Sequence, residues 1–325
     1  TIDVSHREED SQTRTIRVRH DDCGRLGPPL DKPAARVLDA SLMNYRHAYH
    51  AGNFADVLKH VVLSLVLVHM AKKEAAFRVI DTHAGIGMYV PTSIGAQRPG
   101  EWGGRTARLI GPDAAPLPES AAALLAPYLN AVRALNPDGR LHRYPGSPCL
   151  ALALMRAQDR LVANELHPED AETLTQNLAG DRRAKVLGLD GWLALKAQLP
   201  PKERRGVILV DPPYEETGEL ERLAQGLQNA RRRFAGGVYL LWYPIKDPRL
   251  IARFHQAISK VAPPETLAVE LLIREPSDTD RLNGSGLIVI NPPYTLEADL
   301  TELLPELSER LAVGSGARAE IVRLG

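Results

Sequence analysis

Residues 207–218, "VILVDPPYEETG", decide how this chain folds. The first four are branched apolar residues, a run typical of a strand that is buried on both faces of a parallel sheet. An acid, two prolines and a tyrosine follow the strand directly. Because proline fixes φ at about −65° and has no backbone N–H to donate, it ends the strand in a rigid turn. The stretch therefore predicts a buried strand whose end holds Asp211 and Tyr214 in fixed positions.

Apolar runs of the same kind recur along the chain. Seven of them are bounded by turn residues, at 77–81, 160–165, 184–190, 206–211, 237–244, 267–273 and 286–291. Helical patterns occupy the segments 53–73, 168–179, 219–234 and 248–261. In the first of these the apolar residues Val57, Val61, Leu65 and Val68 recur at helical spacing. Strands that alternate with helices predict an α/β fold with a mostly parallel sheet covered on both faces.

The connections indicate how the seven strands are arranged. Segment 274–285 is rich in Asp, Ser and Gly and leaves no room for a long helix, so the last two strands should pair as a hairpin with one strand antiparallel. The expected order across the sheet is 3-2-1-4-5-7-6. The longer interval 90–145 has a helical centre and is interpreted as a helical insert after the first strand. Residues 1–42 mix charges with Pro and Gly, and we expect a disordered leader, extraneous to a folded domain at 43–325.

Composition argues against several classes of protein. Forty Lys and Arg residues balance forty Asp and Glu residues, so no overall positive field attracts nucleic acid and any basic groove must be local. Cys23 and Cys149 are the only cysteines, which argues against a disulfide framework and a cysteine-rich zinc module. The longest apolar stretch, 60–71, is too short and too polar at its ends to span a bilayer, and no signal peptide is recognised. We expect a soluble protein in a reducing compartment.

Each of the first four strands finishes in an acid: Asp81, Glu165, Asp190 and Asp211. Ligands of an open parallel sheet bind outside the carboxyl ends of the strands, so these acids lie where a site is expected. Any one of them is as readily explained as a helix N-cap or a turn former. Four in succession favour a binding site.

A glycine-rich turn, "THAGIGMY" at 82–89, follows the first strand. Gly85 and Gly87 allow a close backbone approach to a ligand, although the third glycine of a dinucleotide fingerprint is missing and a plain tight turn is the alternative. Glu165 is placed to accept hydrogen bonds from ribose hydroxyls, and Asp190 to accept one from an adenine amine. Because no GxxxxGK[ST] phosphate loop is present, a nucleoside without phosphates fits best, and S-adenosylmethionine is such a ligand.

An exocyclic adenine amine could be bound and activated by Asp211, Pro212 and Tyr214. That amine is a poor nucleophile because its lone pair is delocalised into the ring. The Asp211 carboxylate and the Pro212 carbonyl would each accept one N–H, and Tyr214 would stack on a base that has left its own stack. Since the prolines hold these acceptors in place before the base arrives, the rate gain comes from preorganisation. A rigid turn with no catalytic role is the alternative.

A second copy of the motif, "LIVINPPYT" at 287–295, closes the last strand. In the expected strand order, Asp211 lies beside the first strand and its glycine turn. The segment 291–294 should lie further along the same edge. We therefore interpret the second copy as a turn that ends a strand.

Several histidines raise the question of a zinc site. His47 and His50 are three residues apart, with His60 and His83 elsewhere, but no cysteine pair accompanies them and ordinary polar or packed histidines are the alternative. We expect no metal, because methyl transfer from a sulfonium to an amine needs none. The segment before 60 is interpreted as a cap over the substrate, in which four side chains approach the base or a phosphate: Tyr45, Arg46, His47 and Lys59. His60 would face the cofactor.

Together these motifs resemble the RlmJ (YhiR) family of bacterial 23S ribosomal RNA adenine-N6 methyltransferases, over 43–325. The matching segments occur in the family's order: "MNYRHAYHAGNFADVLKH", "DTHAGIGMY", "YPGSP", "NELHP", "DG", "RRGVILVDPPYE", "LWYPI" and "SGLIVINPP". The resemblance implies a Rossmann-like class I methyltransferase in the cytoplasm, expected to be a monomer. It would methylate N6 of one adenine in 23S ribosomal RNA with S-adenosylmethionine.

The resemblance also assigns roles to individual residues. Asp211 would accept the proton, and Tyr45 would meet the RNA. The cofactor pocket would be lined by His60, His83, Ser147, Glu165, Asp190, Gly191 and Asp211, beside the glycine turn. Ser147 has a second interpretation from the sequence alone, because Ser followed by Pro148 is a good N-cap for the next helix.

Three other functions are compatible with parts of the pattern. A DNA adenine-N6 methyltransferase would use the same chemistry, but no target-recognition domain is recognised and the neutral charge argues against tracking duplex DNA. A protein glutamine methyltransferase would carry Asn where Asp211 stands. A catalytically silent RNA-binding assembly factor would need neither the acids nor the glycine turn.

Overall fold

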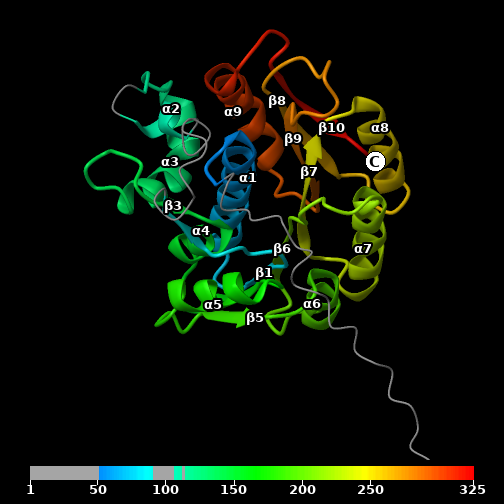
Figure 1. The fold of residues 1–325 in the computed structure, drawn as a ribbon. Coiled ribbons are helices and arrows are strands. Elements are labelled where there is room, and N and C mark those ends of the chain that lie inside the picture. Colours follow the sequence, from blue (N-terminus) through cyan, green and yellow to red (C-terminus); the bar gives the residue numbers. More distant parts are fainter. Residues whose placement is uncertain (1–50, 91–105, 112–113) are drawn as a thin grey trace, which may run out of the picture. The chain divides into compact units, whose positions relative to one another are not determined.

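Strands and helices alternate along the chain, which confirms the α/β fold class (Figure 1). The computed structural model describes residues 51–90, 106–111 and 114–325, all of them in one compact unit, Ala40–Gly325. The leader expected at 1–42 lies outside the described residues, as do Tyr45, Arg46, His47 and His50. The strands are β1 (Arg78–Asp81), β2 (Met88–Tyr89), β3 (Tyr144–Pro145), β4 (Arg160–Asn164), β5 (Ala184–Leu187), β6 (Gly206–Val210), β7 (Val238–Ile245), β8 (Leu267–Leu272), β9 (Gly284–Ile290) and β10 (Arg318–Arg323). The helices are α1 (Phe54–Ala71), α2 (Ala107–Ile110), α3 (Glu119–Ala134), α4 (Ser147–Leu154), α5 (Pro168–Asn177), α6 (Gly191–Gln198), α7 (Glu219–Arg233), α8 (Pro248–Ser259) and α9 (Leu296–Leu311).

The main sheet of the described residues has eight strands in the order β10-β8-β9-β7-β6-β1-β4-β5. β5, β4, β1, β6 and β7 pair with one another in parallel. Leaving β10 aside, the strands follow one another as 3-2-1-4-5-7-6 in the numbering of the seven expected strands. β9 is antiparallel to both β7 and β8, and β10 is antiparallel to β8. The expected count of seven strands, with one antiparallel, was therefore too small by the edge strand β10.

Helices cover both faces of the sheet, and the strands bury both of their faces. In β6, Val207 and Leu209 belong to the apolar cluster formed with α1, α3, α4 and α9. Ile208 and Val210 belong to a second cluster formed with α6, α7 and α8. Because side chains alternate along a strand, a continuous apolar run is what two covered faces require.

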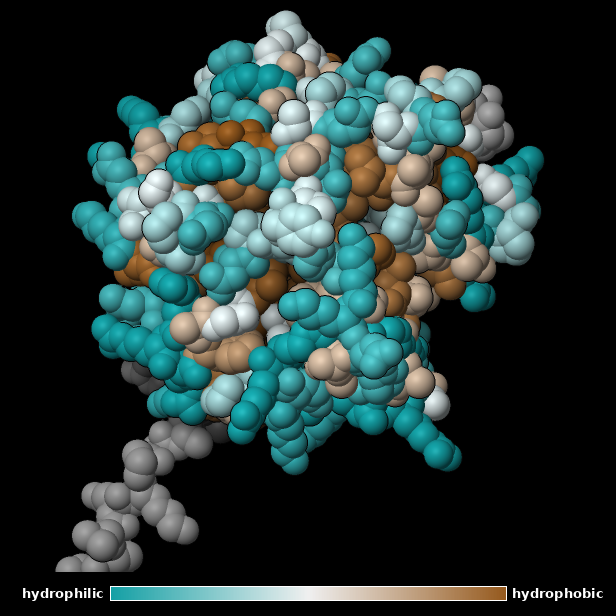
Figure 2. Space-filling view, turned by 180° about the vertical axis from the view of Figure 1, so that it is seen from behind, coloured by the Kyte–Doolittle hydropathy of each residue, from teal (hydrophilic) through white to brown (hydrophobic). Residues whose placement is uncertain are grey.

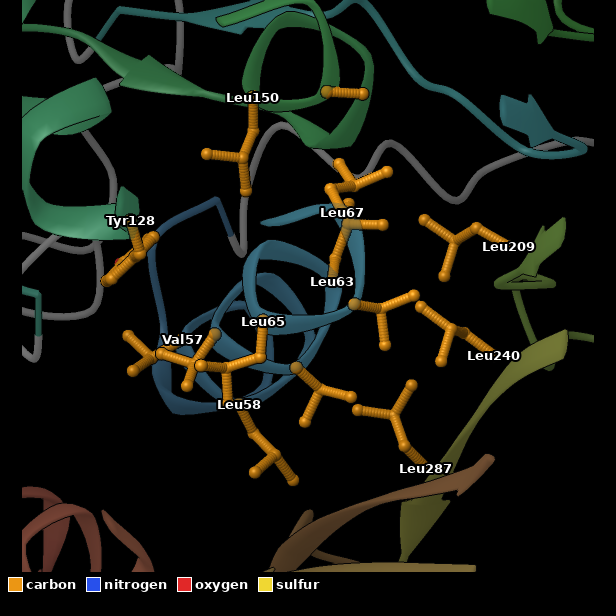
Figure 3. Packing of buried hydrophobic residues seen from close by; sticks show 14 of the residues in the cluster. Val57, Leu58, Leu63, Leu65, Leu67, Tyr128, Leu150, Leu209, Leu240 and Leu287 are labelled. Atoms are coloured by element: carbon orange, nitrogen blue, oxygen red, sulfur yellow. The ribbon is translucent and has the colours of Figure 1, made fainter. Parts of the chain in front are cut away.

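Helix α1 occupies the centre of the first cluster. It begins after Asn53, whose side-chain oxygen accepts hydrogen bonds from the backbone N–H groups of Ala55 and Asp56, at 2.8 and 3.2 Å. Figure 3 shows the helix surrounded by side chains from three strands and two helices: Tyr128, Leu150, Leu209, Leu240 and Leu287. Val68, expected on the apolar face, is instead 37% exposed near the end of the helix.

By length and composition alone, α1 would be able to cross a membrane, which the stretch 60–71 was not expected to do. The helix is 18 residues long, but 83% of its apolar window is buried inside the protein, as in the core helix of a soluble fold. Hydrophilic side chains cover much of the molecular face in Figure 2, with apolar patches between them.

The interval expected as a helical insert contains α2 and α3 and ends in β3, which pairs with β2. Two arginines attach this region to α9 and to the segment after it. The Arg108 guanidinium donates to the carbonyls of Arg310 and Ala312, and that of Arg310 donates to the carbonyls of Ala115 and Pro116. Since α3 also packs on α1, the insert adjoins the helix that reaches the candidate site.

Candidate active site at the carboxyl edge of the sheet

The parallel register brings the ends of β1, β4 and β6 to one edge of the sheet. Asp81 pairs across the sheet with Ala163 of β4 and Leu209 of β6. Glu165 and Asp211 each lie two residues beyond those partners, so the three acids are neighbours at the same edge. The structure thus brings together the strand-end acids that the sequence singled out.

Asp211 is held by a buried lysine. The Lys59 ammonium lies 2.6 Å from Asp211 Oδ2 and 2.7 Å from Asp56 Oδ1, and the three side chains are at most 10% exposed. Burial lowers the pKa of Lys59, but the two carboxylates outweigh it and raise that pKa above its usual value. Lys59 therefore stays charged and fixes the Asp211 carboxylate in the low-dielectric interior.

This pairing corrects the role expected for Lys59. We predicted that it contacts a phosphate of the substrate, but its ammonium is buried between two carboxylates and has no free surface for that contact. Asp56, in the first turn of α1, is the second partner. The signal that was missed is the spacing of Asp56 and Lys59, since residues three apart share one face of a helix.

The two prolines and Tyr214 form the rigid turn that the sequence predicts. Tyr214 has φ of 55°, its hydroxyl donates to the Trp242 carbonyl at 2.6 Å, and its ring meets the Trp242 ring edge-on with centroids 5.4 Å apart. Burial, followed by the charge of Asp211, raises the pKa of Tyr214, so the hydroxyl stays protonated and keeps this bond. The turn after Asp211 is anchored to β7 by a side chain.

The second copy of the motif lies at the opposite edge of the sheet, not further along the same one. Because β9 is antiparallel, its last residue Ile290 pairs with Tyr239 near the start of β7. Asn291 follows with φ of 51°, and its side-chain amide donates to the carbonyls of Ala235 and Gly237 at 2.8 and 2.7 Å. These contacts support its interpretation as a turn that ends a strand.

The glycine turn is ordered by Glu165. One carboxylate oxygen of Glu165 accepts the Gly85 N–H at 2.9 Å and the other accepts the His167 N–H at 2.9 Å. Gly85 and Gly87 have φ of 59° and 78°, and a Cβ on Gly85 would collide with the Tyr89 hydroxyl. Both positions therefore require glycine. Burial raises the pKa of Glu165, despite the two backbone donors.

Asp190 caps α6 and lies near the partly buried His83. Its Oδ1 accepts the N–H groups of Trp192 and Leu193 at 3.1 and 3.0 Å, so the N-cap role weighed for this acid is present. The space where Gly191 would carry a Cβ is filled by the His83 ring. Burial lowers the pKa of His83 to about 4, so this imidazole is neutral at pH 7. Asp190 Oδ2, 3.6 Å from Arg222, is the oxygen left to accept from a ligand.

Ser147 and His60 complete the residues expected around the cofactor. The Ser147 hydroxyl donates to Asp81 Oδ2 at 2.6 Å, while Gly146, not Ser147, is the N-cap of α4. The N-cap role expected for Ser147 was therefore wrong by one residue. Burial raises the pKa of Asp81 to about 6, against the hydrogen bond from Ser147 and the charge of Lys59. His60 Nδ1 lies 2.8 Å from the Tyr144 hydroxyl, in the buried core between α1 and β3.

A metal centre has no basis in the part of the chain that the structure describes. No group of three or more His, Cys, Asp or Glu side chains with metal-binding geometry occurs among those residues. The polar groups at the carboxyl edge are backbone N–H donors, carboxylate acceptors and the neutral imidazole of His83. Such a set suits the hydroxyls, amines and carboxylate of a nucleoside that carries an amino acid, and the glycines allow the protein backbone to approach that ligand closely.

The comparisons with known proteins agree on one family. Residues 74–322 match the family model described as "RsmJ: Ribosomal RNA large subunit methyltransferase D, RlmJ". Ribosomal RNA large subunit methyltransferase J of Escherichia coli is 40% identical over 280 residues, 86% of this chain and 98% of that protein. The protein of the same name from Haemophilus influenzae is 39% identical over 271 residues, which cover 83% of this chain and 94% of that protein. The crystal structure of the Legionella pneumophila protein LPL1258 superposes with a TM-score of 0.74 at 30% identity, covering 84% of this chain and 98% of that one.

Proposed function

The chain belongs to the RlmJ family of ribosomal RNA large subunit methyltransferases, and from that premise we propose which atom it methylates and how. The substrate is 23S ribosomal RNA, and the acceptor is the exocyclic N6 of one adenine. The methyl donor is S-adenosylmethionine. The protein acts as a monomer in the cytoplasm, where ribosomal RNA is made and assembled.

The observation that carries the proposal is the pairing of Asp211 with Lys59. Among the described residues, Lys59 is the hydrogen-bond partner of Asp211, and it contacts Oδ2. Oδ1 then remains to accept one N–H of an adenine amine, and the Pro212 carbonyl accepts the other. Because the ammonium is fixed and charged, the Asp211 carboxylate is oriented before the base arrives, which is the condition for electrostatic preorganisation.

The chemistry balances with these groups alone. When bound, S-adenosylmethionine would supply the methyl group from its positively charged sulfur and would leave as a neutral thioether. The amine gains the methyl group and must lose one proton, and Asp211 is the acceptor at hydrogen-bond distance. His83 is neutral near pH 7 and adds no positive charge that would oppose a sulfonium.

The remaining site residues divide between cofactor and RNA. We assign the cofactor to His60, His83, Gly85, Gly87, Ser147, Glu165, Asp190, Gly191 and Asp211. In this assignment Glu165 holds the glycine turn and accepts from ribose, and Asp190 accepts from the cofactor's adenine through Oδ2. Tyr214 packs against the target base, which Tyr45, Arg46 and His47 approach from the amino-terminal side.

The test is to incubate the protein with labelled S-adenosylmethionine and separate pools of 23S ribosomal RNA, duplex DNA and protein. We expect label in the RNA alone, recovered after nuclease digestion as N6-methyladenosine at about one per molecule. Label in DNA would favour the DNA methyltransferase. Label only in protein, or in none of the pools while the cofactor is bound, would refute the proposal.

A further inference from the structure

A pocket of about 450 Å³ lies beside the turn that follows Asp211. One wall is the segment from Tyr214 to Glu221, and the other is the end of β7 with the first turns of α8. Because β6 and β7 are parallel, both walls start at the carboxyl edge of the sheet. The volume falls within the roughly 300–1,000 Å³ of small-molecule sites, so one nucleotide fits. Among the described residues proposed to contact the cofactor or the target base, only Tyr214 lines this pocket.

The α8 wall is basic in a chain that is neutral overall. Segment 246–260 contains Lys246, Arg249, Arg253 and Lys260 against a single acid, Asp247. All four basic side chains are exposed, and Arg249, Arg253 and Lys260 are spaced four and seven residues apart, on one face of the helix. Asp247 caps the helix and pairs with Arg249 at 2.9 Å. Lys246 and Arg253 line the pocket and form no ion pair with any other described residue.

The opposite wall of the pocket is acidic, and part of the pocket lining is apolar. Glu216 and Glu219 each lie 3.4 Å from Arg222, while Glu221 lines the pocket in the first turn of α7. Leu250, 49% exposed, and the buried Ile251 and Phe254 contribute the apolar part of the lining from α8. A nucleotide matches this polarity. Its phosphate would pair with the basic wall, its base would pack on the apolar lining, and the amino groups of the base would donate to the carboxylates.

We propose that this pocket, which we call the α8 pocket, holds the nucleotide next to the target adenine in the substrate RNA. The RNA backbone then runs along the exposed basic face of α8, with Lys246 and Arg253 on the phosphate at the pocket. Tyr214 belongs both to the turn after Asp211 and to the pocket lining, so the two nucleotides occupy adjoining sites. This inference rests on the proposed function, since it assigns a further part of the same RNA substrate.

The charge of the basic wall is tested by the double variant Lys246→Ala and Arg253→Ala. With a 23S ribosomal RNA fragment as substrate, we expect the KM for RNA to rise by roughly tenfold and kcat to stay near that of the wild type. The slope of log KM against log salt should fall by about 0.7 for each lost contact to a single strand. The matched control is the double variant Arg182→Ala and Lys202→Ala, an exposed arginine and an exposed lysine that precede β5 and β6, at the edge opposite the site.

The volume of the pocket is tested without changing charge. Leu250→Trp fills the α8 pocket, and it should raise the KM for RNA while leaving the dissociation constant for S-adenosylmethionine unchanged. Val313→Trp is its control, because Val313 is 48% exposed and lies beyond α9, away from the pocket. Equal effects of the two tryptophans, or no effect of either, would overturn the assignment.

The outcomes separate this inference from the proposed function. If the wild type methylates 23S ribosomal RNA and both α8-pocket variants match it in KM and salt slope, the pocket does not hold RNA, although the function stands. If the wild type methylates no RNA, the proposed function itself fails. A variant that lowers kcat with the KM for RNA unchanged would also contradict a binding role for this pocket.

Discussion

A single lysine decides how the acid at the centre of the site behaves. Lys59 lies between Asp56 and Asp211, and all three side chains are buried. Removing one member of a buried ion pair is costly because it leaves the other charge uncompensated. The stability of the fold and the orientation of Asp211 therefore depend on the same side chain.

Replacing Lys59 with Gln should lower the free energy of unfolding by about 3 kcal/mol, since two buried carboxylates lose their counter-ion. Methyl transfer should fall as well, because Asp211 is no longer oriented. Urea denaturation at pH 7 measures the first effect. Lys185→Gln is the control, an exposed lysine on β5. Equal unfolding free energies for the two variants would show that the buried pairs contribute nothing.

His83 should make the protein less stable in acid. Its pKa falls from 6.5 to about 4 on burial, so its contribution is complete above pH 6.5 and is lost as the pH falls from 6.5 towards 4. From pH 7.5 to pH 5 this amounts to about 2 kcal/mol. Asp81, whose pKa is raised to about 6, gains stability over the same range in both proteins, so the His83 contribution is the difference in pH dependence between the wild type and His83→Asn, measured by urea unfolding at both pH values. A His83→Asn variant with the wild-type pH slope would contradict the pKa shift.

At the residue scale, the sequence predicted the acids but not their partners. Asp81, Glu165 and Asp211 were identifiable because each follows an apolar run, and parallel strands bring such ends together. The pairing of Lys59 with Asp211 joins residues 152 apart in the chain. It depends on how α1 packs against the sheet, which helical periodicity alone does not specify. The hydrogen bond from Ser147 to Asp81 likewise depends on how α4 packs against β1, which the sequence pattern does not specify.

At the scale of elements, strand direction separates two nearly identical motifs. β6 and β9 both end in an acid or amide followed by two prolines and a tyrosine, but β9 runs the other way. The sequence predicted that one strand of the last hairpin is antiparallel, and this already implies opposite edges for the two motifs. Edge strand β10 was missed because its alternating, charged sequence "RAEIVR" contains no apolar run.

Asn291→Ala should leave methyl transfer within about twofold of the wild type, because Asn291 lies at the edge opposite Asp211. The same change should lower the free energy of unfolding by about 2 kcal/mol, since it removes hydrogen bonds to two carbonyls and places alanine at positive φ. Transfer assays and urea denaturation of one preparation measure both. Loss of transfer with normal stability would mean that the second motif, not the first, is catalytic.

At the scale of the whole molecule, zero net charge removes long-range attraction for RNA and leaves recognition to local surfaces. Basic side chains on α8 form one such surface beside the site. The fold class was predictable from the pattern of alternating elements, and the same pattern predicts which edge of the sheet holds the candidate site. The polarity of the α8 pocket was not, since its walls come from two segments that only the packed structure brings together.

The central claim is that the Asp211 carboxylate accepts a hydrogen bond from the adenine amine of the RNA and then takes its proton. The direct measurement is the single-turnover rate of N6-methyladenosine formation in 23S ribosomal RNA, with saturating S-adenosylmethionine, by the wild type and by Asp211→Ala. We predict a loss of roughly a hundredfold or more in the variant, with its circular dichroism spectrum unchanged. A folded Asp211→Ala protein that methylates the same adenine at close to the wild-type rate would contradict the account.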